Sequence, residues 1–260
     1  MALTENAKKY RDRLYQVDED LYENDPEFIE RLENFMFDET INTTPQSEKE
    51  LTERLRFMCI LATLMGCQGL ELFKVNVAAA LKAGVKPNEI KELVYQGCDY
   101  LGYGRVYPFL KATNDVFKAE GISLPLENAA TTTMENRLEM GVQTQVNLFG
   151  EALRNFPNMG PEDQRHINRW LSANCFGDYY TRIGLNYSER EMITFCFLSA
   201  QGGVEPQLTS HADANLKNGN DKKFMIAVIS VCVPYIGYPR TLNALRCLNT
   251  AYENFIANQK

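Results

Sequence analysis

The feature that most constrains the fold of this 260-residue chain is an internal repeat with a constant spacing of 135 residues. The segment ANLKNG at 214–219 resembles AALKAG at 79–84, and YIGYPRTLNAL at 235–245 resembles YLGYGRVYPFL at 100–110. Because the spacing holds over so long a span, we infer two copies of one structural unit, joined near 120–145. The residue pairs that keep this spacing include Gly84 and Gly219, Gly102 and Gly237, Arg105 and Arg240, and Asn114 and Asn249.

The apolar pattern within each copy is helical. In the second copy, residues 192–198 form a broad apolar face at helical spacing, and Gly202-Gly203 breaks that helix. Gly219 is a C-terminal stop for the next helix, and Pro239 disfavours helix in the residue before it. The predicted helices that follow the Gly-Gly break are 206–218, 221–235 and 239–257. Those of the first copy are 52–66, 69–83, 87–101 and 105–119.

Earlier helices are predicted at 26–37 and 161–173, and the stretch NTTPQSEKE at 42–50 is predicted as a loop. No run shows a convincing two-residue alternation, so we expect almost no β-strand. The predicted fold class is all-α, with two tandem helical units. We place the first in residues 1–125 and the second in residues 126–260.

Composition restricts the possible partners. Charged residues make up 23 % and hydrophobic residues 45 % of the chain, as in folded soluble proteins. The net charge of −7 gives no sign of the basic face of a nucleic-acid binder. The charged start MALTENAKKYRDRLYQ does not resemble a signal peptide, and no run reaches the length of a membrane span. We expect a cytoplasmic protein that binds neither nucleic acid nor membranes.

The seven cysteines have no dense spacing and form no CxxC pair. This pattern argues against a disulfide framework and against a zinc site. Most of the cysteines lie inside apolar runs, where a thiol behaves as a small hydrophobic group. We therefore expect buried thiols and no metal site.

Three spaced elements of the second copy, SEREMIT, QLTSHADANLKNG and YIGYPRTLNAL, resemble the carboxymuconolactone decarboxylase family, which includes the alkylhydroperoxidase D-type proteins. The resemblance covers about 26–118 and 161–255. It implies an all-α unit that assembles into hexameric rings. Two fused units then imply a homotrimer that mimics such a hexamer.

The two copies differ at two titratable positions. Glu191 and His211 of the second copy correspond, at the 135-residue spacing, to Arg56 and Asn76 of the first. A purely structural role would favour similar residues in both copies. We therefore predict that chemistry resides in the second copy, and that the first copy carries a degenerate site and supports assembly.

Helix geometry places this acid and this imidazole at similar heights. Glu191 lies about eleven residues before the Gly-Gly break and His211 about eight after it, which gives an offset of roughly 4–5 Å if the helices are antiparallel. A carboxylate and an imidazole within hydrogen-bonding reach suit general acid–base catalysis. Two simpler roles remain open. Ser188 and Glu191 also match a capping box, and His211 lies on a polar helix face, as a solvated or merely hydrogen-bonded histidine would. His166 is predicted to be a surface residue.

The resemblance also bears on the chemistry. The peroxidase branch of the family carries a CxxC ahead of the histidine, and Val204 and Gln207 occupy those two positions here. The decarboxylase chemistry needs no cofactor, because the lactone carbonyl accepts the electrons that the departing carboxylate leaves. Arg190 and Arg240 are candidate substrate-binding residues, since a guanidinium pairs well with a carboxylate. Both also have simpler alternatives: Arg190 as a solvent-facing residue, and Arg240 as a scaffold contact, because Arg105 matches it in the first copy.

We therefore predict a cofactor-free lyase that resembles 4-carboxymuconolactone decarboxylase. It would act on a small lactone or an unsaturated carboxylic acid, with His211 as proton donor and Glu191 orienting it. The alternatives are an alkylhydroperoxidase D-like peroxidase, which the missing CxxC disfavours, and a non-catalytic oligomeric binding protein.

Overall fold

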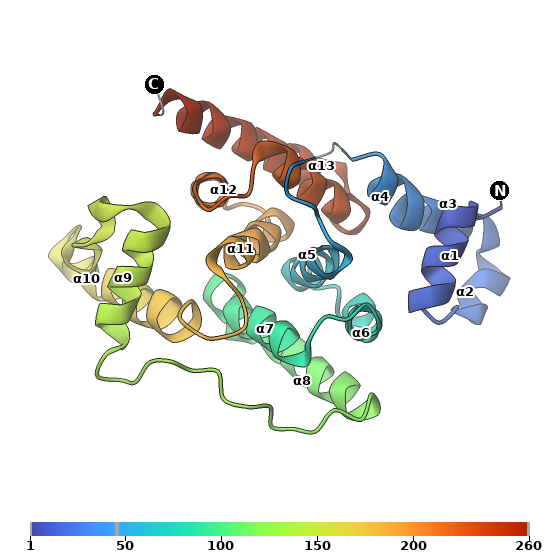
Figure 1. The fold of residues 1–260 in the computed structure, drawn as a ribbon, viewed down its shortest axis with the longest axis horizontal. Helices are drawn as coiled ribbons and strands as arrows, with labels where there is room; N and C mark the ends of the chain where they lie inside the picture. Colours follow the sequence, from blue (N-terminus) through green and yellow to red (C-terminus); the bar gives the residue numbers. More distant parts are fainter. Residues whose placement is uncertain (1, 45–46, 259–260) are drawn as a thin grey trace.

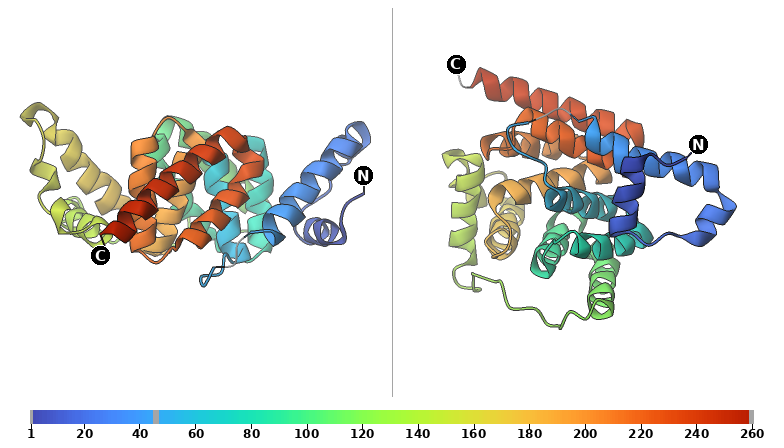
Figure 2. Two further views of the ribbon diagram at one scale, coloured as in Figure 1. Left: turned by 90° about the horizontal axis from the view of Figure 1, so that it is seen from above. Right: turned by 45° about the vertical axis from the view of Figure 1, so that its right-hand side comes forward.

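The computed structural model describes residues 2–44 and 47–258, and no β-strand occurs in them. Helices of both copies form one central bundle (Figure 1). Seen from above, the N-terminal helices and the α9–α10 region project from opposite sides of this bundle (Figure 2). The all-α prediction is therefore confirmed. Within the predicted loop at 42–50, residues 45 and 46 lie outside the described residues.

The helices of the two copies match each other at the 135-residue spacing. The first copy has α5 (Glu53–Gly66), α6 (Leu70–Lys82), α7 (Pro87–Leu101) and α8 (Tyr103–Ala119). The second copy has α11 (Tyr187–Gln201), α12 (Glu205–Lys217) and α13 (Lys222–Ala257). These bounds agree with the predicted ones to within two residues, apart from the one long helix α13.

Helix α13 is two helices joined at a kink. Gly237 has a φ of 71°, a backbone conformation that side chains with a Cβ rarely adopt. Gly102, the equivalent residue, has a φ of 80° and separates α7 from α8. The two predicted helices at 221–235 and 239–257 are therefore both present. Length and composition alone would also allow α13 to cross a membrane, but many of its apolar residues lie in the protein core.

The helices α1 (Glu5–Leu14), α2 (Glu19–Asn24) and α9 (Arg137–Phe149) lie outside the predicted set. Helix α9 corresponds to α1 at the 135-residue spacing, so the structural repeat extends further towards the N-terminus than the sequence pattern does. The boundary at 125/126 stays a prediction.

The predicted helices at 26–37 and 161–173 are divided in the structure. The first consists of α3 (Pro26–Asn34) and a wider π-helical turn, η1 (Phe35–Glu39), which leads into α4 (Thr40–Asn42). The second contains α10 (Arg165–Trp170) and a longer π-helical segment, η5 (Leu171–Tyr179). Short 3-10 turns precede α10 at Glu151–Leu153, Phe156–Asn158 and Glu162–Gln164.

The centre of the bundle is the contact between α5 and α11, one helix from each copy. At Gly66 an added Cβ would lie only 2.6 Å from the Ala200 Cβ and 2.8 Å from the Phe197 carbonyl oxygen. Small residues at this crossing let the two backbones approach closely. The surrounding apolar side chains of both copies belong to one continuous core. The copies are therefore packed into one body.

Helix α9 is fastened to η5 by backbone contacts at two glycines. A Cβ on Gly141 would lie 1.8 Å from the Ser172 carbonyl oxygen, and one on Gly177 would lie 2.1 Å from the Arg137 carbonyl oxygen. Neither contact can be relieved by turning a side chain. The position of α9 therefore depends on glycine at both places.

We predict that Gly141→Ala lowers the free energy of unfolding by at least about 1–3 kcal/mol, because the methyl group would overlap backbone atoms. The matched control is Gly104→Ala in α8, where an added Cβ meets no atom within 4 Å. That control should be neutral or stabilising by about 0.5–1 kcal/mol. Urea denaturation of both variants measures the difference, and equal stabilities would contradict the close contact.

Candidate active site between the two copies

Helix α11 begins with a capping box that leaves Glu191 free for another role. The Asn186 side chain accepts a hydrogen bond from the Glu189 N–H at 3.0 Å, and the Glu189 carboxylate accepts one from the Asn186 N–H at 3.0 Å. The alternative capping box of Ser188 and Glu191 is therefore wrong. Glu191 lies one turn further in, and none of its surface is exposed.

Helix α12 brings His211 against Glu191. Gly202 and Gly203 have φ values of 70° and 72°, and this turn folds α12 back along α11. His211 Nδ1 lies 2.7 Å from Glu191 Oε2. The predicted contact between the two side chains is thus confirmed. His211 is only 9 % exposed, so the alternative of a solvated histidine is wrong.

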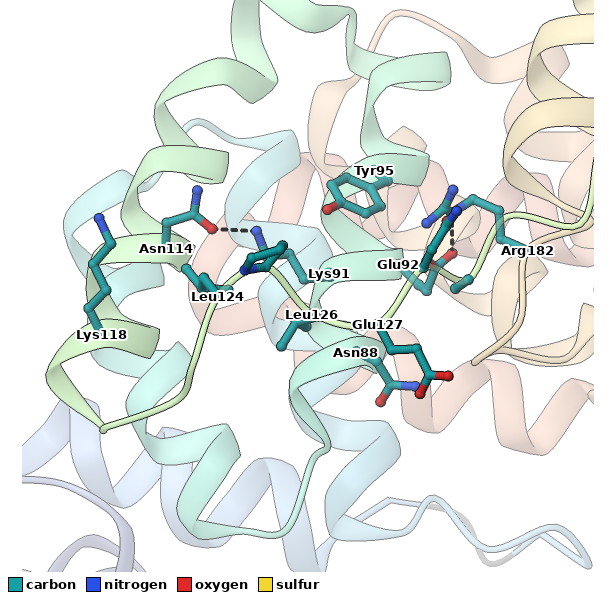
Figure 3. A pocket seen from close by; sticks show the side chains of 13 residues that line it. Asn88, Lys91, Glu92, Tyr95, Asn114, Lys118, Leu124, Leu126, Glu127 and Arg182 are labelled. Carbon is teal, nitrogen blue, oxygen red and sulfur yellow. Dashed lines mark hydrogen bonds and ion pairs between the residues drawn. The ribbon is translucent and has the colours of Figure 1, made fainter. Parts of the chain in front are cut away.

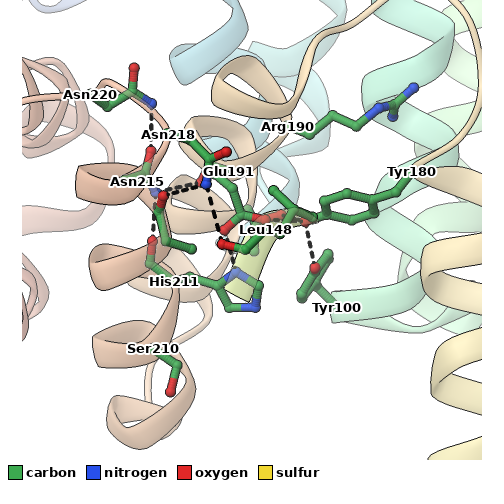
Figure 4. A network of polar contacts seen from close by, with 12 residues as sticks. Tyr100, Leu148, Tyr180, Arg190, Glu191, Ser210, His211, Asn215, Asn218 and Asn220 are labelled. Atoms are coloured by element: carbon green, nitrogen blue, oxygen red, sulfur yellow. Dashed lines mark hydrogen bonds and ion pairs between the residues drawn. The ribbon is translucent and has the colours of Figure 1, made fainter. Parts of the chain in front are cut away.

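Asn215 locks the two helices in this register. Its side-chain Nδ2 donates to the backbone carbonyls of Glu191 at 2.9 Å and His211 at 2.8 Å. Asn220 in turn donates to the Asn215 side-chain oxygen at 2.7 Å (Figure 4). Buried amide groups with all these partners satisfied fix the relative height of the acid and the imidazole.

The second oxygen of Glu191 accepts a hydrogen bond from a tyrosine. The Tyr180 hydroxyl donates to Glu191 Oε1 at 2.9 Å. With its only proton used there, Tyr180 accepts from the Tyr100 hydroxyl at 2.7 Å and the Thr194 hydroxyl at 2.9 Å. Gln96 supplies the last donor, to the Thr194 oxygen at 2.8 Å. The network shown in Figure 4 therefore directs its donors towards one carboxylate.

Burial keeps the two tyrosines protonated. It raises the pKa of Tyr180 and that of Tyr100 well above the ordinary value of 10, and the nearby Glu191 charge raises both further. Both side chains thus remain hydroxyl donors across the physiological pH range. The two oxygens of Glu191 thus have separate partners, the Tyr180 hydroxyl on one and His211 Nδ1 on the other.

The walls around the imidazole come from elements outside α11 and α12. The rings of Tyr100 in α7 and Phe149 in α9 meet the His211 ring edge-on, at centroid distances of 5.3 and 5.7 Å. Tyr100 belongs to the first copy, so both copies build this site. The second ring nitrogen of His211, Nε2, points away from Glu191 (Figure 4).

The two predicted substrate-binding arginines do not join this pair. Arg190 is fully buried, with its guanidinium 3.2 Å from Glu92 and hydrogen bonded to Gln96 and the Arg182 carbonyl. It has no exposed surface for a substrate, and here it is a structural residue.

Arg240 is exposed and donates to the carbonyl of Ala200, at the other end of α11 from Glu191. Ala200 lies nine positions after Glu191 in α11, which is about 13–14 Å along the axis. Arg240 therefore does not reach the acid–imidazole pair within this chain.

Five of the seven cysteines are buried, as expected, whereas Cys67 and Cys98 are half-buried. The sulfur atoms of Cys196 and Cys232 lie 3.9 Å apart in the core. Cys175 lies 3.9 Å from the Tyr100 hydroxyl, and burial raises the pKa of its thiol well above the ordinary value of 9. A thiol in this state is a poor nucleophile. Among the described residues, no group of three His, Cys, Asp or Glu side chains is placed to hold a metal ion.

The corresponding place in the first copy is filled by aromatic rings. Arg56 stands where Glu191 stands, and it lines a cavity of only about 10 Å³ together with Tyr15, Phe37 and Tyr235. The Tyr15 hydroxyl donates to the Asn76 side-chain oxygen at 2.9 Å, so the residue equivalent to His211 is occupied as well. His166, predicted at the surface, is exposed and packs edge-on against Trp170.

Sequence reasoning missed Tyr180, Tyr100 and Phe149 as parts of the site. Tyr100 has an equivalent in the second copy, Tyr235, and a residue present in both copies is more simply explained by packing than by one active site. The two copies exchange these tyrosines. Tyr100 of the first copy lies beside His211 of the second copy, and Tyr235 of the second copy lies beside Arg56 of the first. Tyr180 and Phe149 lie in segments whose helices the sequence pattern did not define.

A carboxyl group near the site makes stability depend on pH. Burial raises the pKa of Asp99 from 3.8 to about 8, and its Oδ2 has no hydrogen-bond partner among the described residues. The folded protein therefore binds a proton that the unfolded chain releases. The contribution of Asp99 to the free energy of unfolding is therefore largest below about pH 3.8, and it is lost as the pH rises towards 8.

We predict that Asp99→Asn makes the protein less sensitive to pH over this window, since the amide does not ionise. Urea midpoints measured at several pH values for wild type and variant test it. Parallel pH profiles for the two proteins would contradict the raised pKa.

Comparison with known proteins agrees with the repeat and the fold. The carboxymuconolactone decarboxylase family model matches residues 26–115 and 166–250, which is more than half of the chain. A 4-carboxymuconolactone decarboxylase of Acinetobacter baylyi is 26 % identical over 132 residues, which cover 48 % of this chain and 95 % of that protein. The relative is thus about as long as one copy. The chain belongs to the carboxymuconolactone decarboxylase family and carries the family unit twice.

Proposed function

We propose that the protein is a cofactor-free lyase that decarboxylates a small lactone or an unsaturated carboxylic acid by general acid–base catalysis. The observation that supports it most is the 2.7 Å contact between Glu191 and His211, buried beneath rings from both copies. The Acinetobacter relative is named for decarboxylation of 4-carboxymuconolactone, and this activity is the starting point of the proposal.

The proposed reaction balances without a redox partner. The bond between the ring carbon and the carboxylate breaks, and CO₂ leaves. The electron pair spreads through the ring double bond to the lactone carbonyl oxygen. One proton from His211 Nε2 then forms a new C–H bond, and solvent restores the proton.

The contact with Glu191 orients His211 for this step. It occupies Nδ1 and leaves Nε2, the nitrogen that points away from the acid, to transfer the proton. Tyr180 holds the Glu191 carboxyl group in place. Glu191 is therefore a positioning residue, and His211 is the proton donor.

The peroxidase alternative has weaker support. Val204 and Gln207 occupy the places of the CxxC pair, and the nearby Cys175 thiol is buried with a raised pKa. Peroxide reduction by this route would need a reactive thiolate beside His211. The binding-protein alternative differs from the lyase only in the absence of turnover, so a kinetic test separates them.

We predict that His211→Asn, which copies Asn76 of the first copy, folds normally and loses about 10²–10⁴-fold of its turnover of 4-carboxymuconolactone or a related lactone. Glu191→Gln should lose less, because the amide still accepts a hydrogen bond. The matched control is His166→Asn, which alters the exposed histidine and should leave turnover unchanged.

Steady-state CO₂ release measures the turnover of all three variants. Full activity in His211→Asn would end the catalytic role of this histidine. Peroxide reduction that is lost on replacing Cys175 would favour the peroxidase instead.

We also propose that the chain assembles as a homotrimer. Large side chains are exposed at equivalent places in both copies: Tyr103 and Tyr238 are 59 % and 65 % exposed, and Tyr107 and Leu242 are 50 % and 59 % exposed. Each pair is 135 residues apart, so the two copies present similar apolar faces. Matching faces of this kind are suited to a ring in which copies alternate.

We predict a particle of about three times 29.7 kDa in light scattering at micromolar concentration. Replacing Tyr103 and Tyr238 together by Lys should shift it towards smaller species, because two charges would be buried at each contact. Exchange of exposed Met134 for Lys is the control. A stable monomer of the wild-type protein would contradict the proposal.

A further inference from the structure

A cavity of about 520 Å³ lies outside the candidate active site, between α7, α8 and the connection between the copies (Figure 3). Leu124, Pro125 and Leu126 of the connection form its apolar wall. Lys91 and Tyr95 of α7 line it from the side of the core. The cavity therefore combines an apolar wall with a buried cation.

Lys91 is the unusual member of this lining. It is only 7 % exposed, yet its ammonium group has no carboxylate partner among the described residues. Its nitrogen donates to the side-chain oxygen of Asn114 and lies 5.7 and 5.9 Å from the ring centres of Tyr95 and Phe117. Burying an ammonium without a counter-charge is costly, and this burial lowers the pKa of Lys91.

The other charged side chains of the lining balance one another, so that Lys91 supplies the net positive charge. Arg182 lines it and is paired with Glu92 at 2.9 Å, and Glu92 also contacts the buried Arg190. Lys118 is exposed at the rim, and Glu127 is the remaining acid of the lining. Together with Lys91, these groups leave the cavity positive in a chain whose net charge is −7.

The second copy lacks this set of side chains. At the 135-residue spacing, Lys91 corresponds to Ile226, Tyr95 to Ser230 and Lys118 to Glu253. The helices of the second copy form without a buried cation at this place. The fold therefore does not require Lys91, and an isoleucine satisfies the same position.

We infer that this cavity binds a small organic acid, with its carboxylate on Lys91 and Lys118 and its apolar body against Tyr95, Leu124 and Leu126. A carboxylate on Lys91 would supply the counter-charge that the described residues do not provide. A volume of about 520 Å³ is within the range of small-molecule sites. This site is separate from the acid–imidazole pair and goes beyond the proposed function.

The test uses the full-length His211→Asn protein, so that binding at the candidate active site is perturbed and turnover is suppressed. The probe is 4-fluorobenzoate, followed by its ¹⁹F line broadening, with neutral 4-fluorobenzyl alcohol as the matched probe. We expect saturable binding of the acid and much weaker binding of the alcohol.

The Lys91→Met change keeps the length and removes the charge, and it should weaken 4-fluorobenzoate binding by about 10–100-fold. Lys118→Met, at the exposed rim, should weaken it by a smaller factor and leave folding intact. The control is Lys111→Met, because Lys111 is an exposed lysine of α8, the helix of Lys118, and lies outside the cavity.

Several outcomes would overturn the inference: no saturable binding, equal binding of the alcohol, or unchanged affinity in both Lys91→Met and Lys118→Met. Equal displacement by inorganic phosphate would also do so, since it would show an inorganic-anion site with no use for the apolar wall. Because turnover is absent from this assay, its result is independent of the proposed lyase activity.

Discussion

The close crossing of α5 and α11 determines most of what this molecule can do. At Gly66, Ala200 and Phe197 the two helices approach until backbone and small side chains touch, and the copies share one core as a result. This crossing sets α7 of the first copy beside α11 of the second, so that Gln96 and Tyr100 reach Thr194 and Tyr180. A site built from two copies is possible only because they do not form separate domains.

The repeated helices could be predicted well from the sequence, because each helix end occurs once in each copy and the two occurrences support each other. Gly102 and Gly237 both carry a positive φ, so each confirms the helix break at the other. The contact of Glu191 with His211 was also predictable, because helix rise and a tight Gly-Gly turn fix the heights. The π-helical segments were not, since they depart from the 3.6-residue pattern. Helix α9 was not either, because its buried face includes Gly141, Thr144 and Gln145 in place of apolar side chains.

The arginines show where reasoning from residue type alone is insufficient. A guanidinium suits a substrate carboxylate and a structural carboxylate equally, and only burial separates the two. Arg190 is paired with Glu92 inside the protein, whereas Arg240 binds a backbone carbonyl at the far end of α11. The neighbours of equivalent residues also differ between the two copies. Arg56 of the first copy is surrounded by rings that include Tyr15 and Phe37, whereas Glu191 of the second copy contacts the imidazole of His211.

The close packing of α9 against η5 affects how ligands reach the candidate site. Phe149 lies at the end of α9 against His211, and the helix is held by backbone contacts that leave no room for it to slide. Phe149 is therefore a fixed side of the site, because moving α9 away would separate closely packed main chains. In the proposed reaction, the substrate would enter and CO₂ would leave past the exposed part of the His211 side chain, which is 11 % of its surface. The width of this opening would then limit, by size, which substrates reach His211.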